Sequence, residues 1–413
     1  MKSQTTSSHS VSWRFFIPAL LILILVPHHV IRFAPGGPID PGGVVQAITS
    51  TSSYEDGVVV VELKPNKDPN QLAAQYNLVV QEQIDGDFWL MGIPDGRMVS
   101  DVIDQMENDK DVKSVEPNYL LAVPEVDQRS VFHVDGPGAS GTFFQQAALQ
   151  VIRALDAQAL ADGSGVVVAV VDTGVEGGHP ALGNVLAGYD YVDNDSDPSE
   201  VTGGPGYGHG TMVAGLITLV APGVSIMSVR AFGPDGRGST SDVAKAIRFA
   251  AMNGADVINL SFGTVDQPQA MRGAINFART RAVLVASAGN QATEVPMEYP
   301  ASDVNVVAVA ATDLQDYKAS FSNYGSHIRV CAPGVSLTSA YPGGSYATSE
   351  GTSFAAALVS GTVALVLAAG QRDAVSAIEN SAVNIDALNP GYQGLLGSGR
   401  IDAYEAVSGG WYE

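Results

Sequence analysis

Five short runs of mostly apolar residues, rich in Val, Ile and Ala, recur between residues 166 and 310, and they constrain the fold more than any other feature of the chain. A strand with one face in water alternates apolar and polar residues, so an unbroken run indicates a strand that is buried on both faces. Segments with helical composition separate the runs. The sequence therefore predicts a doubly wound parallel α/β domain, with helices on both faces of one sheet. The expected strands are Val166–Val171, Ser225–Phe232, Asp256–Phe262, Ala282–Ala288 and Val304–Ala310.

A smaller unit of strand and helix patterns precedes this domain, from residue 54 to residue 123. Its segments follow the order strand, helix, strand, strand, helix, strand, which predicts a small ferredoxin-like α+β domain. About seventy residues form only a marginal core, so we expect this unit to need a partner for stability. The clearest segments are a strand at Val58–Leu63, a helix from Asn70, a strand at Phe88–Ile93, a helix at Val99–Glu107 and an edge strand at Val112–Val115.

The N-terminus has the pattern of an export signal. Lys2 and Arg14 precede an uncharged run of thirteen residues, 15–27, which is short for a bilayer-spanning helix and typical of the core of a signal peptide. No clear small-x-small cleavage site follows, so a cleaved signal peptide and a retained membrane tether through residues 15–27 are both open. In either case we expect an extracytoplasmic protein, either secreted or anchored at the membrane.

Composition divides the chain into five segments. Residues 34–53 are rich in Pro, Gly, Ser and Thr, and residues 124–145 contain several Gly and Pro residues, so both stretches are typical of linkers. The expected division is a signal peptide or signal anchor at 1–33, a linker at 34–53, the small domain at 54–123, a connector at 124–145 and the α/β domain at 146–413.

The net charge of −22 argues against nucleic acid as the main partner, because binding phosphates requires a basic face. A single cysteine, Cys331, excludes an intrachain disulfide. It lies in the apolar run Ile328–Ala332, which favours a small buried side chain over a cysteine nucleophile.

Three polar residues stand at the ends of expected strands or helices in the α/β domain. Asp172 follows the first strand in the sequence Val-Val-Asp-Thr-Gly, at the sheet edge where the sites of open α/β folds assemble. His209 is flanked by glycines, which leave its imidazole accessible. Ser353 opens an apolar helix in Gly-Thr-Ser-Phe-Ala, at the positive end of the helix dipole. Each alone has a plain structural explanation, as a cap, a cation ligand or a structural histidine.

Together these residues provide the parts of a nucleophilic active site. A serine hydroxyl attacks poorly until a base takes its proton, and the base needs a partner that fixes its tautomer. We therefore expect Ser353 as nucleophile, His209 as base and Asp172 as the orienting carboxylate. Asn290, which follows the strand Ala282–Ala288, offers an amide N–H for the oxyanion, although it also fits a turn cap.

The order Asp, His, Ser in these contexts resembles the subtilisin-like serine proteases, over roughly residues 146–408. The resemblance implies a subtilisin-like fold and a serine endopeptidase that acts on proteins or peptides. It also implies catalytic roles for Asp172, His209, Asn290 and Ser353. Three further segments that carry the resemblance are Ile226–Arg230, Gly254–Gly263 and Gly397–Asp402.

The same resemblance implies a surface for the substrate backbone. A bound peptide would pair with the enzyme as an added strand, a form of β-augmentation. The substrate-binding residues that we expect are Ser261, Phe262, Gly263, Ser287, Ala288 and Gly289.

Two positions depart from the pattern of that family. It usually has His where this chain has Met212, and Pro where this chain has Ala357. Neither position supplies a reacting group, so we interpret both as differences in packing.

Residues 54–123 resemble the inhibitory propeptide of the same family, and their end reads Val-Glu-Pro-Asn-Tyr-Leu-Leu-Ala-Val. The resemblance implies a zymogen that cuts itself, with its own propeptide as a partner that assists folding and then blocks the cleft. We expect the apolar run Tyr119–Val123 to fill the substrate pockets, and we expect self-cleavage between Leu120 and Thr142.

Asp193, Asp195 and Asp197 place three carboxylates within five residues. The loop is not an EF-hand, because Pro198 and Gly204 stand where that motif needs Gly and Glu. It resembles the calcium loop of thermitase-like members of the family, which implies a structural calcium ion. A solvated acidic loop is the alternative.

Two other functions stay open at this level. One is a catalytically silent protein of the same fold that only binds a partner, and reaction with a fluorophosphonate probe would separate it from a protease. The other is a maturation protease of narrow specificity, which cleavage of a peptide library would separate from a broad endopeptidase.

Overall fold

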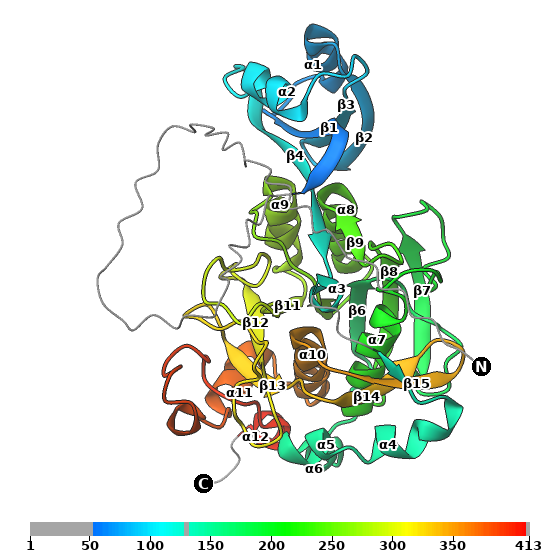
Figure 1. Cartoon of the computed structure of the whole chain (residues 1–413), viewed down its shortest axis with the longest axis vertical. Coiled ribbons are helices and arrows are strands. Elements are labelled where there is room, and N and C mark those ends of the chain that lie inside the picture. The colour runs from blue at the N-terminus through cyan, green and yellow to red at the C-terminus, as the bar shows by residue number, and fades with distance from the viewer. Residues whose placement is uncertain (1–52, 128–131, 410–413) are drawn as a thin grey trace, which may run out of the picture. The chain divides into compact units, whose positions relative to one another are not determined.

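The computed structural model describes residues 53–127 and 132–409, and Figure 1 shows the arrangement of their helices and strands. The expected signal segment at 1–33 and nearly all of the expected linker at 34–53 lie outside the described residues. Within the described part of the chain, none of the helices has the length and apolar character needed to cross a bilayer.

A sheet of seven parallel strands forms the centre of the larger domain (Figure 1). Its strands pair in the order β13-β12-β11-β10-β6-β8-β7, so the chain enters at β6 and extends the sheet on both sides of it. The predicted doubly wound parallel sheet is therefore confirmed. The strands are β6 (Val167–Asp172), β7 (Asn184–Asp190), β8 (Ser225–Arg230), β10 (Val257–Leu260), β11 (Val283–Ser287), β12 (Val306–Thr312) and β13 (Val330–Pro333).

Successive residues of β6 point to opposite faces of this sheet and enter different cores. Val168 and Val170 belong to the core that includes helices α7 and α10, whereas Ala169 and Val171 belong to the core that includes α8 and α9. Both faces are therefore covered, which is why the strand reads as an unbroken apolar run. The helices are α7 (His209–Val220), α8 (Thr240–Met252), α9 (Gln269–Ala278) and α10 (Thr352–Ala368).

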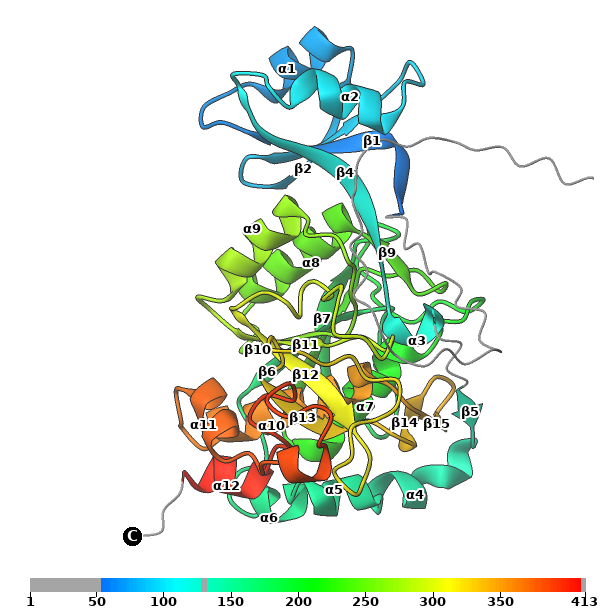
Figure 2. The same ribbon diagram turned by 60° about the vertical axis from the view of Figure 1, so that its left-hand side comes forward.

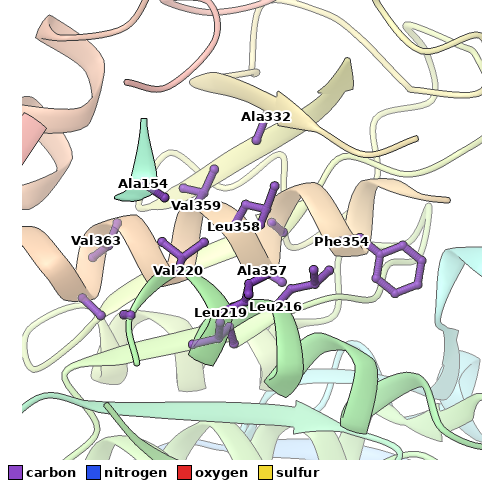
Figure 3. Close-up of a cluster of buried hydrophobic side chains, with 14 of the residues drawn as sticks. Ala154, Leu216, Leu219, Val220, Ala332, Phe354, Ala357, Leu358, Val359 and Val363 are labelled. Atoms are coloured by element: carbon purple, nitrogen blue, oxygen red, sulfur yellow. The ribbon is translucent and has the colours of Figure 1, made fainter. Parts of the chain in front are cut away.

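Helix α10 is apolar on every side, and 15 of its 17 residues are buried, as expected for a helix inside a core rather than on a surface. Figure 3 shows Ala357 and Leu358 of α10 in one cluster with Leu216 and Leu219 of α7. Burying a leucine side chain of this kind stabilises the fold by about 1.5–3 kcal/mol. Ala357 and Met212 are both fully buried in this core, in agreement with the interpretation of these positions as packing differences.

The small domain has the predicted order of elements. Its strands form an antiparallel sheet in the order β2-β3-β1-β4, with helices α1 and α2 in the two crossovers. This is the ferredoxin-like arrangement that the sequence predicts. The elements are β1 (Tyr54–Leu63), α1 (Pro69–Tyr76), β2 (Val79–Asp85), β3 (Phe88–Gly92), α2 (Val99–Met106) and β4 (Val112–Ala122).

Strand β4 differs from the prediction of a short edge strand that ends at Val115. It continues to Ala122, and its last three residues pair with β9 (Arg237–Ser239) of the large domain. β4 therefore lies between β1 and β9 rather than at an edge (Figure 2). The sequence concealed this extension because Pro117, which lacks a backbone N–H, interrupts the apolar pattern in the middle of the strand.

The expected connector at 124–145 contains α3 (Pro124–Asp127), β5 (His133–Val134) and α4 (Ser140–Phe144) in its described part. β5 pairs with β15 of a hairpin that the sequence analysis did not predict. The remaining elements are the 3₁₀ turns η1 (Pro137–Ala139) and η2 (Asp386–Leu388), α5 (Ala147–Val151), α6 (Ala154–Gln158), β14 (Leu337–Tyr341), β15 (Ser345–Ser349), α11 (Ala374–Asn380) and α12 (Ala403–Ser408).

Cys331 lies in β13 and has no exposed surface. Burial raises the pKa of its thiol well above the usual range, so the thiol stays protonated, and it donates a hydrogen bond to the carbonyl of Leu396 at 3.3 Å. The prediction of a small buried side chain is confirmed.

Candidate active site

The four predicted catalytic residues come from four different elements whose ends meet at the carboxyl edge of the large sheet. Asp172 is the last residue of β6, His209 is the first residue of α7 and Ser353 is the second residue of α10. Asn290 follows β11 by three residues. All four residues have no exposed surface.

The imidazole of His209 is oriented by Asp172. The Nδ1 atom of His209 lies 2.7 Å from Oδ1 of Asp172, which also accepts the backbone N–H of Thr173 at 2.7 Å. A carboxylate at Nδ1 holds the proton there and directs Nε2 toward the reacting side of the site.

A residue that the sequence analysis did not single out occupies the centre of the site. Oε2 of Glu125 lies 2.9 Å from Nε2 of His209 and accepts the hydroxyl of Ser353 at 2.8 Å. Oε1 of the same carboxylate accepts the side-chain N–H of Asn290 at 3.1 Å. The site therefore converges on one carboxylate, whose side chain is 1% exposed. A Cβ at Gly351 would lie 1.8 Å from Oε1, so this glycine leaves the space that the carboxylate fills.

The electrostatics of this arrangement favour an ion pair. Burial lowers the pKa of His209, but the flanking carboxylates of Asp172 and Glu125 outweigh burial and raise this pKa to about 10. Burial raises the pKa of Glu125, but its hydrogen bonds, that with His209 first, hold this pKa below its ordinary value. The imidazole is therefore protonated at neutral pH, and a protonated imidazole does not act as a base.

The amide of Asn290 is held in one orientation. Its Oδ1 accepts the N–H of Thr352 at 2.9 Å and the hydroxyl of the same residue at 2.8 Å, which turns Nδ2 toward the centre of the site. The preceding Gly289 has φ of +98°, and a Cβ there would lie 2.4 Å from side-chain atoms of Asn323 and Glu298. Only glycine fits this turn.

The end of strand β4, which comes from the small domain, enters the cleft in an extended conformation. Leu121 pairs with Gly238 of β9, and Ala122 exchanges two backbone hydrogen bonds with Gly263, of 3.0 and 3.2 Å, on its other side. Leu121 and Val123 are both fully buried. The pairing at Gly263 was expected from the sequence, whereas β9 was not, because its short Arg-Gly-Ser sequence carries no strand pattern.

The other predicted substrate-binding residues lie around this strand. The carbonyl of Ser261 accepts the hydroxyl of Ser353 at 3.4 Å, and the ring of Phe262 packs against Phe232 with centroids 4.8 Å apart. Ser287 ends β11, and Ala288 continues it with a bond from its N–H to the carbonyl of Val309.

The small domain also caps two helices of the large domain. The carboxylate of Glu116 accepts the N–H groups of Gln269 at 2.8 Å and Ala270 at 3.1 Å, at the start of α9. Oδ1 of Asn118 accepts the N–H of Ser241 at 2.9 Å, in the first turn of α8. The first N–H groups of a helix have no partner within the helix, so these contacts satisfy donors that would otherwise be unpaired, and they join the domains.

The three carboxylates predicted to bind calcium do not form one ligand set. Oδ2 of Asp193 lies 2.5 Å from the guanidinium of Arg230, while Oδ1 of Asp195 accepts the N–H of Asp197 at 2.8 Å. Among residues 53–127 and 132–409, no group of three or more His, Cys, Asp and Glu residues has the geometry to hold a metal ion. These residues do not fit a calcium ion in this arrangement. A calcium ion at this loop stays a prediction.

Comparison with protein families gives two matches along the chain. The model described as "Subtilase family" matches residues 163–397, and the model described as "Fervidolysin N-terminal prodomain" matches residues 41–118. The first covers more than half of the chain and contains Asp172, His209, Asn290 and Ser353.

Relatives and solved structures agree with these matches. Thermitase of Thermoactinomyces vulgaris is 41% identical over 272 residues, which cover 62% of this chain and 94% of thermitase. A thermophilic serine proteinase of a Bacillus species is 37% identical over 324 residues, covering 75% of this chain and 76% of that protein. The crystal structure of fervidolysin from Fervidobacterium pennivorans, a keratinolytic enzyme related to subtilisin, superimposes with a TM-score of 0.72 at 27% identity. That likeness covers 86% of this chain and 61% of the fervidolysin chain.

Proposed function

The chain belongs to the subtilase family of serine endopeptidases, and we propose that it hydrolyses peptide bonds with Ser353 as nucleophile, His209 as base and Asp172 as the orienting carboxylate. The observation that carries the proposal is the convergence of His209, Ser353 and Asn290 on one carboxylate. The chain belongs to a family of enzymes, which supports catalysis over the alternative of a catalytically silent protein of the same fold. A maturation protease of narrow specificity stays an alternative.

In the proposed reaction, Ser353 Oγ transfers its proton to Nε2 of His209 as the oxygen attacks the peptide carbonyl carbon. The imidazolium returns this proton to the leaving amine, and Asp172 stabilises the imidazolium meanwhile. The amide N–H of Asn290 donates to the oxyanion of the tetrahedral intermediate, a contribution worth about 10²–10³ in rate in the relative subtilisin. Water then hydrolyses the acyl-enzyme by the same proton transfers in reverse order.

The precursor is latent in this proposal, because Glu125 occupies the place of the scissile carbonyl. Ala122 pairs with Gly263, so a strand continued for two more residues would bring Pro124 opposite Ser261, next to the nucleophile. Pro124 instead begins α3, and it has no N–H to pair there. A side-chain carboxylate, which offers no bond to cleave, thus faces Ser353.

The substrates that fit this cleft are extended peptides. A peptide would take the place of residues 120–123, with its backbone between β9 and Gly263. Leu121 and Val123 are fully buried there, which supports a preference for apolar side chains at those positions of the substrate. The propeptide at 54–123 and an extracytoplasmic location belong to the same proposal.

Replacing Ser353 by Ala tests the proposal. We expect hydrolysis of casein to fall by about 10⁶-fold in kcat, the size of the effect in the relative subtilisin, and the precursor to stay uncut. Ser164→Ala is the matched control, because Ser164 is exposed and precedes the opposite end of β6. N-terminal sequencing of both products also reports where the signal segment and the propeptide are cut. A Ser353→Ala protein that matures and degrades casein would exclude this mechanism.

A further inference from the structure

Glu200, in the loop between β7 and α7, has no role in the reaction proposed above but holds the segments that carry it. Its Oε1 accepts the backbone N–H of Thr211 at 3.0 Å and the hydroxyl of the same residue at 3.1 Å. Its Oε2 accepts the N–H of Gly208 at 3.0 Å. Both oxygens also accept from the hydroxyl of Thr173, at 3.3 and 3.2 Å.

Glu200 caps the helix that presents His209. The N-cap position of α7 is Gly208, which has no side chain to cap the helix, and the first turn contains no acidic residue. A helix start leaves several N–H groups without partners and favours a negative charge nearby. Glu200, which lies in another loop, accepts the N–H groups of Gly208 and Thr211 and also places a carboxylate at the start of the helix.

The same carboxylate reaches the end of β6. Thr173 follows Asp172 in the chain, and its hydroxyl donates to Glu200 while accepting the N–H of Gly210 at 3.0 Å. The first turn of α7 is in close contact with the end of β6, because a Cβ at Gly210 would lie 3.1 Å from Cβ of Asp172. A shift of the first turn of α7 would therefore move the imidazole relative to its carboxylate partner.

We propose that Glu200 is a positioning residue of the active site, which keeps the first turn of α7 against the end of β6 and so keeps His209 within hydrogen-bond reach of Asp172. The proposal rests on the catalytic roles proposed for these two residues. The hydrogen bonds of Glu200 go to Thr173, Gly208 and Thr211, whereas the strand in the cleft is held by β9 and Gly263. Its loss should therefore affect kcat rather than KM.

The charge of Glu200 supports this role and provides a separate readout. Burial raises its pKa to about 7, and the nearby charge of Asp172 adds to the rise. Because its pKa is about 7, Glu200 is fully charged only above neutral pH and partly charged where the imidazole titrates. A neutral residue at this position removes that partial negative charge beside the imidazolium of His209, so the pKa of that imidazole should fall by a fraction of a unit. The other titratable groups facing this site are Tyr207, Tyr341 and, in the precursor, Glu125.

The Glu200→Gln variant tests the proposal. It is expressed as the full chain and assayed after it has processed itself, and its active sites are counted by fluorophosphonate labelling. The NH₂ group of the glutamine would face N–H donors, so the variant would lose part of the cap of α7. We therefore expect kcat per labelled site to fall about 10-fold, with KM within about two-fold of the wild-type value. The acid limb of the profile of kcat/KM against pH should move to lower pH by roughly half a unit.

Glu176→Gln is the matched control. Its carboxylate also accepts two backbone N–H groups, those of Gly343 at 2.9 Å and Gly344 at 3.2 Å, but neither belongs to the segments that carry Asp172 and His209. We expect the kcat and the acid limb of this variant to match those of the wild type. Glu200→Asp keeps the charge and shortens the reach, so we expect an intermediate kcat with an unmoved acid limb.

A Glu200→Gln enzyme with wild-type kcat per site and an unmoved acid limb would overturn the inference, because a cap that only stabilises the fold changes the number of active sites and not their rate. If that variant does not accumulate as folded protein, Glu200→Asp decides. A kcat per site at the wild-type value contradicts the proposal, and a loss of about three-fold or more supports it. Absence of labelling at Ser353 in the wild type would instead contradict the proposed function itself.

Discussion

Asp172 and Glu125 both place a carboxylate oxygen against the imidazole of His209, at 2.7 and 2.9 Å, but they belong to different regions of the molecule. Asp172 ends a strand inside the seven-stranded sheet, between two covered faces. Glu125 lies in the four-residue helix α3, which directly follows the strand that enters the cleft from the small domain. The large domain provides the side chains of the site, and the segment from the small domain occupies the space in front of them.

The two carboxylates make similar contacts with the imidazole of His209, but the contacts have opposite effects on its availability as a base. Asp172 binds Nδ1 and leaves Nε2 available for the serine proton, whereas Glu125 binds Nε2 and accepts the serine hydroxyl itself. With both carboxylates in place, the pKa of His209 is about 10 and the imidazole has no free position for a proton. In the proposed mechanism, removing the second region would therefore free His209 to act as the base, with the first region unchanged.

The largest expected effect in this comparison comes from Glu125→Ala. Truncating one partner of a buried charged pair costs about 2 kcal/mol or more, so the cleft of the uncut precursor should open about 30-fold more often. The measurement is the rate of fluorophosphonate labelling of the precursor band. Glu107→Ala, an exposed glutamate of the same small domain, is the control and should label at the wild-type rate. Equal rates for Glu125→Ala and the wild type would show that Glu125 does not close the site.

The second effect is on pH dependence. The pKa of His209 is raised in the closed precursor, so its attraction to Glu125 is fully present below the pKa that His209 has in the open site. It is lost as pH rises through about 10. The labelling rate of the precursor should therefore rise roughly 10-fold between about pH 9 and about pH 11, relative to the processed enzyme.

Glu125→Gln is the control for this pH effect, because its neutral amide has no charge to pair with the imidazolium. Its labelling rate should be high at neutral pH and nearly flat over the same interval. A Glu125→Gln profile as steep as that of the wild type would assign the pH effect to another group.

The smallest effect concerns the contact between the domains. Asn118→Ala removes the bond that the small domain makes to the N–H of Ser241 in the first turn of α8, a capping-type contact worth about 1 kcal/mol, so labelling of the precursor should increase about five-fold. Asp68→Ala is the matched control, because Asp68 caps α1 within the small domain. An equal increase in both variants would mean that stability of the small domain, rather than the contact, sets the opening rate.

The large sheet and the site residues on it could be predicted from the sequence because each depends on local pattern. Apolar runs specify buried strands, and Asp172, His209 and Ser353 sit in short glycine-containing motifs at element ends. The backbone pairing at Gly263 was expected from the family resemblance that these motifs carry, whereas the order of the strands in the sheet comes from the structure.

Glu125 could not be predicted in this way. Nothing in Val-Pro-Glu-Val distinguishes a residue that fills an active site from an ordinary residue of a connector. Its role depends on the strand pairing of Leu121 and Ala122 with another domain and on the turn that Pro124 begins. Glu200 was missed for a similar reason, because its hydrogen-bond partners lie on two other segments of the chain.

We propose that the small domain closes the serine-protease site of the precursor through Glu125. Fluorophosphonate labelling during maturation, with precursor and processed bands separated by size and the labelled residue located by mass spectrometry, tests it most directly. We expect an unlabelled precursor band and a processed band labelled at Ser353. Labelling of the wild-type precursor at the rate of the processed band, or labelling at another residue, would contradict it.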